Sequence, residues 1–124
     1  MREILFRGKR EYDGEWVFGL LGCYYFRPNK KHYHIHNCET DDTEHVVIPE
    51  TVGQFIGLTD KNGKKIFEGD IVKAPIYYDI GCYPHIEHKN IVVTIPKIYN
   101  RNIPIDEKME VIGNIHDNKE LLGE

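Results

Sequence analysis

Three histidines and a cysteine alternate along one short segment of the chain and could together bind a metal ion. The residues are His32, His34, His36 and Cys38. In one uninterrupted β-strand, residues two apart share a face, with Cα atoms about 6.5–7 Å apart. Imidazole and thiolate are ligands that Zn²⁺ prefers. A further ligand could come from Cys82, His85 or His88. Because His-x-His alone is a weak signature, the favoured interpretation is an exposed, histidine-rich strand without a native metal.

Three carboxylates, Asp60, Glu68 and Asp70, could perform acid–base chemistry if they met in one cleft. Asp60 directly precedes Lys-Asn-Gly, and Asp70 follows Gly69. At such positions Asp side chains commonly bond to the local backbone. A structural role in turns is therefore favoured, and we expect Asp70→Ala to lower the melting temperature.

Other catalytic signatures are weak. Cys82 and His85 are three residues apart and could form a nucleophile–base pair, but no oxyanion motif accompanies them. The sequence contains neither Gly-x-Gly-x-x-Gly nor a Walker loop. We therefore expect no cofactor and no enzymatic activity.

Length and composition indicate one folded domain spanning residues 1–124, with 40% apolar residues and plentiful Tyr and Phe. No apolar run approaches the ~18–20 residues that span a bilayer, and the N-terminus lacks the apolar stretch of a signal peptide. Three cysteines at unrelated spacings favour reduced thiols. These features predict a protein of the cytoplasm of a bacterial host cell, without membrane contact.

Short runs of alternating or β-branched residues, separated by Gly and Pro, predict a mainly β fold. The expected strands are 2–7, 15–26, 32–36, 46–48, 54–58, 64–67, 70–73, 91–95 and 109–115. Helical turns are expected at 50–54 and after Asn118, Pro75 is expected to end a strand, and 76–88 has no assignment. Gly8, Gly19 and Gly22 suggest bulges or a close backbone approach. This pattern of short strands and turns predicts a small, partly closed SH3-like barrel built from hairpins, with at most short helices.

The clearest local signal is the Asn62-Gly63 pair between two apolar segments. Asn and Gly both tolerate the positive φ that a type I′ turn needs at its two central residues. The sequence therefore predicts a β-hairpin here.

This hairpin belongs to one of three blocks in which the chain resembles the YopX family of phage and prophage proteins. The blocks are Arg2–Arg10 with Gly14–Gly19, Pro49–Val72, and Glu110–Asn118 with Leu121 and Leu122. Residues 23–48 and 74–108 follow no family pattern that we can quote. The resemblance implies a phage-associated origin and supplies no catalytic residues.

Three kinds of function follow, of which the first is favoured. The first is a non-enzymatic accessory protein that binds itself, as a homo-oligomer, and an unidentified phage or host protein. The alternative is a small nucleic-acid-associated β-barrel, and a metal-dependent hydrolase using His32–His36 is a remote third.

For the nucleic-acid alternative, bases could stack on Trp16, Phe18, Tyr24, Tyr25 and Phe26. Nearby cations are Arg7, Lys9, Arg10, Arg27, Lys30 and Lys31. The formal net charge of −4 argues against the nucleic-acid alternative.

Overall fold

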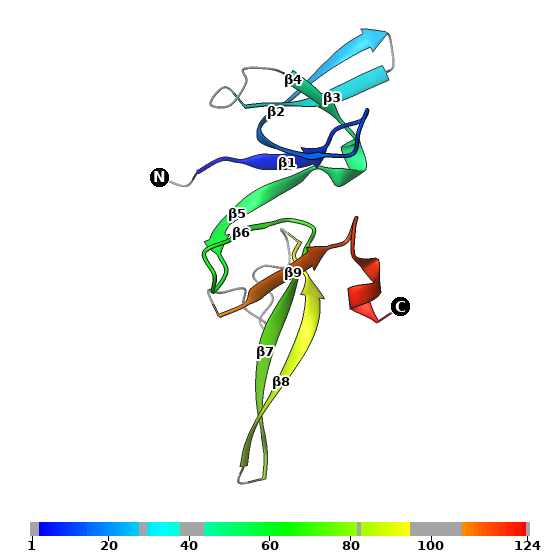
Figure 1. Cartoon of the computed structure of the whole chain (residues 1–124). Helices are drawn as coiled ribbons and strands as arrows, with labels where there is room; N and C mark the ends of the chain where they lie inside the picture. The colour runs from blue at the N-terminus through cyan, green and yellow to red at the C-terminus, as the bar shows by residue number, and fades with distance from the viewer. Residues whose placement is uncertain (1–2, 28–29, 38–43, 82, 95–107, 124) are drawn as a thin grey trace. The chain divides into compact units, whose positions relative to one another are not determined.

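The computed structural model divides into two compact units, residues 1–55 and 56–124, which are described separately. It describes residues 3–27, 30–37, 44–81, 83–94 and 108–123, with the backbone alone for 26–27, 76–80 and 83–85. The described strands are β1 (Phe6–Lys9), β2 (Trp16–Arg27), β3 (Lys30–His36), β4 (Glu44–Val47), β5 (Gly53–Thr59), β6 (Lys65–Phe67), β7 (Asp70–Ile80), β8 (Tyr83–Val92) and β9 (Glu110–Asn114) (Figure 1). Two 3₁₀ turns accompany them, η1 (Pro49–Thr51) and η3 (Lys119–Leu122).

The first unit is an antiparallel sheet in the order β4-β3-β2-β1, with the start of β5 beside β1. This sheet curls until its two ends meet. Arg10 and Val47 form a bridge there. Glu11 N donates to Val46 O, and Ile48 N donates to Lys9 O, each at 2.9 Å. The first unit is therefore partly closed, by one short seam rather than by a full ladder.

The inner face of this curled sheet carries the buried residues of the first unit. Ile35 and Val47 are fully buried, and Gly8 lies against both. Gly19 shows why β2 needs a glycine, because a Cβ there would lie 2.2 Å from the carbonyl oxygen of His36. The expected close backbone approach at Gly19 is thus confirmed.

The second unit contains the β5–β6 hairpin and a three-stranded antiparallel sheet in the order β8-β7-β9. Its core consists of buried apolar side chains. They are Ile56, Ile66, Val72, Ala74, Val93 and Met109. Full burial of an Ile, Val or Met side chain contributes about 1.5–3 kcal/mol through removal of apolar surface from water.

The turn of the β5–β6 hairpin has one residue more than the sequence predicted. Asp60 N donates to Lys64 O at 2.8 Å, which closes a loop of the three residues 61–63. Gly63 N donates to Asp60 O at 3.0 Å, and Gly63 has φ +82°. This is the pattern of a three-residue hairpin loop with glycine in the left-handed region. The hairpin is confirmed, and the two-residue type I′ turn is wrong.

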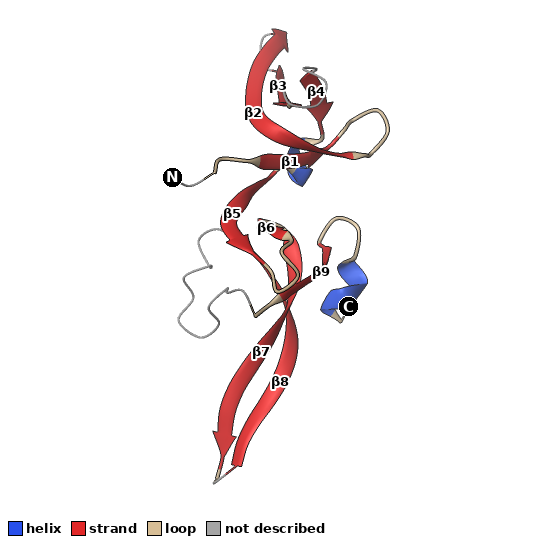
Figure 2. Cartoon of the chain, turned by 60° about the vertical axis from the view of Figure 1, so that its left-hand side comes forward, coloured by secondary structure: helices blue, strands red, loops and turns tan. Residues whose placement is uncertain are grey.

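Strand β7 continues through Pro75, so the expected strand end there is also wrong. Pro75 pairs with His88, and the ladder runs on to Ile80 and Tyr83. A proline is tolerated at this point because β9 accompanies β7 only as far as Lys73, so the missing N–H interrupts no third strand among the described residues. Residues 76–80 and 83–88 of the unassigned segment thus form the outer part of the β7–β8 ribbon (Figure 2).

The mainly β fold built from hairpins is confirmed, and the described helical turns are short, as expected. The described strands form two antiparallel sheets and no closed barrel. The likeness to an SH3 barrel and the single domain over 1–124 stay predictions. Among the described residues, no helix has both the length and the apolar character to cross a membrane.

Candidate functional site

The three histidines of β3 share the outer face of the curled sheet, as their alternation predicted. Their Cα partners on β2 are Tyr24 for His32, Gly22 for His34 and Leu20 for His36. The fourth predicted ligand, Cys38, lies outside the described residues.

His34 is held by packing on both neighbouring strands. Its ring lies 5.1 Å from the Tyr24 ring, centroid to centroid. A Cβ at Gly22 would lie 2.7 Å from His34 Nε2, so the histidine ring occupies the room that glycine leaves. On the β4 side, His34 Nε2 lies 3.7 Å from Glu44 Oε1. With its side chain only 14% exposed, His34 serves as a packing residue of this face.

No three His, Cys, Asp or Glu side chains gather closely enough to hold a metal ion in the part of the chain that the structure describes. Of the further ligands considered, Cys82 lies outside that part, and only the backbone of His85 is described. The metal site at His32, His34, His36 and Cys38 therefore stays a prediction.

Large side chains of β2 alternate along the same outer face. Trp16, Phe18, Leu20 and Tyr24 have one parity, whereas Tyr25 has the other and pairs with Lys31. Arg7 and Lys9 of β1 pair with Phe18 and Trp16. Their charged groups lie 4.7 Å and 5.5 Å from the Trp16 ring centroid. We call the set Arg7, Lys9, Trp16, Phe18, Leu20, Tyr24, His32, His34 and His36 the aromatic face.

A pocket of about 530 Å³ lies in the first unit beside the β1–β2 turn. Its lining residues are Glu11, Tyr12, His32, Glu44, His45 and Val46. Apart from His32, sequence reasoning singled out none of these residues, because the pocket combines a turn with two strands that lie far from it in the sequence.

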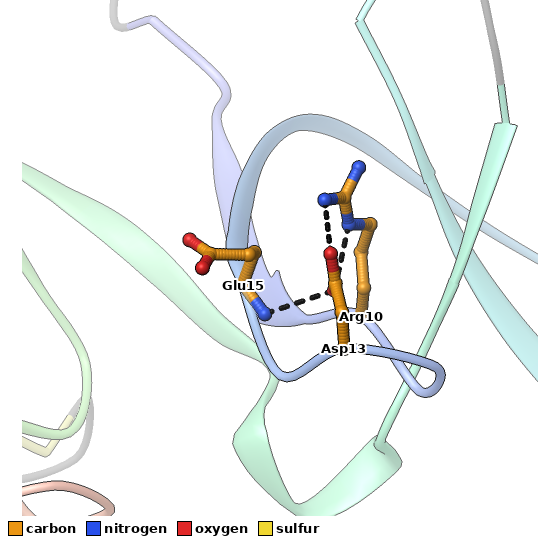
Figure 3. Close-up of polar contacts among 3 residues, drawn as sticks. All are labelled: Arg10, Asp13 and Glu15. Carbon is orange, nitrogen blue, oxygen red and sulfur yellow. Dashed lines mark hydrogen bonds and ion pairs between the residues drawn. The ribbon is translucent and has the colours of Figure 1, made fainter.

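The β1–β2 turn beside this pocket is fixed by one aspartate. Asp13 accepts hydrogen bonds from Arg10 Nε at 2.9 Å and from Arg10 Nη2, and its Oδ1 also accepts from Glu15 N at 3.1 Å (Figure 3). The bond from Arg10 is the main reason that the pKa of Asp13 lies below its usual value, and the same bond raises the pKa of Arg10. The Arg10 guanidinium also lies 4.8 Å from the Tyr12 ring centroid.

The buried carboxylate of Asp60 accepts hydrogen bonds from backbone N–H groups, which is the structural role predicted from the sequence. Oδ1 accepts from Asn62 N and Lys64 N, and Oδ2 accepts from Val111 N, each at 2.9 Å. Burial acts to raise the pKa of Asp60. The three N–H donors and the nearby Lys64 ammonium outweigh it, so the pKa lies below the ordinary 3.8.

Asp70 has a similar structural place, because its buried Oδ2 accepts from Phe67 N at 2.8 Å. Glu68, which precedes Asp70 by two residues in the sequence, is half-buried. The hydrogen bonds of Asp60 and Asp70 confirm the turn roles expected of both residues. Cys23 is an exposed free thiol. The Cys82–His85 pair stays a prediction, because Cys82 lies outside the described residues and only the backbone of His85 is described.

The comparisons with known proteins decide the family. Residues 5–123 match the family model described as YopX protein. The chain belongs to the YopX family. The match includes 23–48 and 74–108, where the sequence showed no quotable pattern, so the His-rich strand and the β7–β8 ribbon lie inside the family domain.

One similar solved structure is that of protein EF1440 from Enterococcus faecalis. It is 23% identical, with 98% of this chain and 99% of that chain covered and a TM-score of 0.42. A search of curated proteins finds no match.

Proposed function

We propose that this YopX-family chain is a phage- or prophage-encoded accessory protein that acts by binding proteins, copies of itself included, and catalyses no reaction. We place it in the cytoplasm of a bacterial host. The observation that carries the binding role is the two-stranded ribbon of residues 74–80 and 83–89.

The ribbon extends beyond the strand that supports its base. β7 and β8 pair from Ile71 with Val92 to Ile80 with Tyr83. β9 pairs with β7 only over Asp70–Lys73. Near the base, Asn90 Nδ2 donates to Leu121 O of η3 at 2.7 Å. Further out, no third strand accompanies either edge among the described residues (Figure 2).

A ribbon of this kind favours association for two physical reasons. An isolated two-stranded hairpin is only marginally stable in water. Its edges also present rows of backbone N–H and C=O groups that can pair with a further strand. Adding a strand from a partner supplies the missing hydrogen bonds, which is a general mode of protein recognition.

A second copy of this chain is the partner that the ribbon fits directly. Two identical edges can pair antiparallel about a two-fold axis, because each then offers the other the same pattern of donors and acceptors. Ile86, an exposed apolar residue of β8, would add buried surface to such a contact. A phage or host protein would use the same edge by the same chemistry.

The test is the oligomeric state of the full chain, measured by light scattering at about 10–100 µM. In the test variant, residues 77–86 are replaced by the dipeptide Asn-Gly, which removes the outer ribbon. Ile76 and Glu87 lie opposite each other on β7 and β8, so a two-residue turn can join them. We expect the wild type to be oligomeric and the shortened variant to be monomeric with its folded circular dichroism spectrum retained.

Ile4→Lys is the matched control, since Ile4 is also an exposed apolar residue but lies outside the ribbon. It should leave the oligomer intact, whereas Ile86→Lys should weaken it. A strict monomer for the wild type, or an unchanged oligomer after shortening, would contradict the proposed self-association.

A further inference from the structure

The aromatic face exposes large apolar side chains that have no part in the proposed self-association through the ribbon. It lies on the first unit, whereas the ribbon lies in the second. Phe18 is 41% exposed and Leu20 is 56% exposed, so these two large side chains are not core residues. They follow Trp16 at spacings of two residues along one strand, which places successive apolar groups about 6.5–7 Å apart.

We propose that the aromatic face binds single-stranded nucleic acid, with bases stacked along β2 and phosphates beside Lys9 and Lys30. Proteins that bind single strands without sequence preference combine stacking side chains with a positively charged path for the backbone. Both components are present on this face.

The stacking component has two parts along β2. The first is Trp16 with Phe18. The second is Tyr24, whose ring stacks with His32 at 6.1 Å between centroids and an interplanar angle of 19°. Phe18 and Tyr24 are six residues apart on one strand, which corresponds to about 20 Å. A short run of nucleotides could therefore contact both parts.

The charge on this face differs in sign from that of the whole chain. Among the described residues of β1–β4 on this face, Lys9 and Lys30 are accessible cations, Lys30 by its alternation with His32. Arg7 is also cationic, but it is buried and contributes only through its field. Two carboxylates lie nearby: Glu44 beside His34, and Glu11, which lines a pocket together with Lys30 and His32. Most of the net charge of −4 thus arises elsewhere, and the end of the face at Arg7, Lys9 and Trp16 suits a polyanion best.

An acidic polypeptide could form ion pairs with the cations of this face, but its Asp and Glu side chains could not stack on the aromatic rings. Every nucleic-acid base has a π-face that can stack on Phe18 or Tyr24, whereas Asp and Glu side chains offer no such surface. The alternating aromatic residues therefore favour nucleic acid, and an acidic polypeptide becomes an outcome that the test must separate.

The first measurement is titration of the wild-type chain with oligo(dT) and oligo(U) of about 15 nucleotides at about 50 mM salt. Trp16 is the single tryptophan, so its fluorescence reports directly on this face. We expect quenching of Trp16, together with increased anisotropy of a labelled oligonucleotide. Poly-glutamate of similar charge should bind far more weakly.

Variants then assign the binding to the face. Phe18→Ala should weaken binding about five- to hundredfold, the range for loss of one stacked base. Tyr25→Ala is the matched control, because Tyr25 lies on the same strand, is 66% exposed and has the opposite parity. It should bind as the wild type does. Lys9→Ala should reduce the slope of log affinity against log salt by about one.

Several outcomes would overturn the proposal. One is no binding to either oligonucleotide at about 100 µM protein and low salt. Binding without Trp16 quenching would place the site elsewhere, and so would an equal effect of Phe18→Ala and Tyr25→Ala. Equal affinity for poly-glutamate would identify a general polyanion or acidic-protein site instead. Wild-type quenching does not depend on whether Phe18→Ala folds, and none of these results depends on the ribbon.

Discussion

Asp60 Oδ2 accepts a hydrogen bond from the backbone N–H of Val111, 51 residues further along the chain. The other carboxylate oxygen holds the turn that follows Asp60 itself. One buried side chain therefore ties the β5–β6 hairpin to β9. Lys61 N, which donates to Met109 O at 2.9 Å, makes a second link between the same segments.

Replacing Asp60 with alanine should lower the free energy of unfolding by about 2–3 kcal/mol, because the half-buried Val111 N–H loses its acceptor. Urea denaturation would measure the change. Lys61→Ala is the control: it removes the exposed ion pair from Lys61 Nζ to Glu110 Oε2 at 3.1 Å, between the same segments. Such pairs contribute less than about 1 kcal/mol. Equal effects of the two substitutions would refute the special role of Asp60.

The lowered pKa of Asp60 predicts an acid-dependent part of the stability. A carboxyl group whose pKa is lower in the folded than in the unfolded chain stabilises the fold above its unfolded pKa. That contribution is lost as the pH falls from about 3.8 through the lower, folded pKa. We expect the stability difference between wild type and Asp60→Asn to be constant near pH 6–7 and to shrink in this acidic window. A difference independent of pH down to about pH 2 would contradict the lowered pKa.

Asp13→Ala should loosen the β1–β2 turn without unfolding the protein. The exposed Asp13 carboxylate holds both Arg10 and Glu15 N, so its removal frees the tip that carries Tyr12. Amide hydrogen exchange should show faster exchange at Glu15, while Gly14, whose N–H donates to Arg10 O at 2.9 Å, should change less. Unchanged exchange at Glu15 would show that the backbone alone fixes this turn.

Gly19→Ala should destabilise the first unit by about 3 kcal/mol, because the added methyl group would collide with the His36 carbonyl oxygen on β3. The melting temperature and near-ultraviolet circular dichroism of Trp16 would report the loss. Leu20→Ala, at the next and exposed position, should change the stability by no more than about 0.5 kcal/mol. A Gly19→Ala protein as stable as the wild type would require a different β2–β3 spacing.

Elemental analysis of untagged protein should find zinc or nickel well below one ion per chain. The His34 ring packs against Tyr24 and Gly22. This packing restricts the rotation that the ring would need to bind a metal together with His32 and His36. One tightly held metal per chain would overturn this expectation and restore the site at His32, His34, His36 and Cys38.

The sequence alone determined the features that depend on near neighbours. Alternation placed His32, His34 and His36 on one face, and the Asn62-Gly63 pair marked a hairpin, because strand periodicity and turn chemistry act over a few residues. Separated blocks of residues also identified the YopX family. The predicted strand end at Pro75 was wrong, since a proline interrupts a ladder only where a neighbouring strand needs its N–H.

Only the tertiary structure decided which distant segments meet. The seam between Arg10 and Val47, the bond from Val111 to Asp60, and the pairing that places Tyr24 beside His32 depend on which strands pair and in which register. Register is set by which strands pair, and one step of slip moves every side chain to the other face. No local pattern contains that information, so the aromatic face and the pocket beside the β1–β2 turn emerge only after the strands are paired.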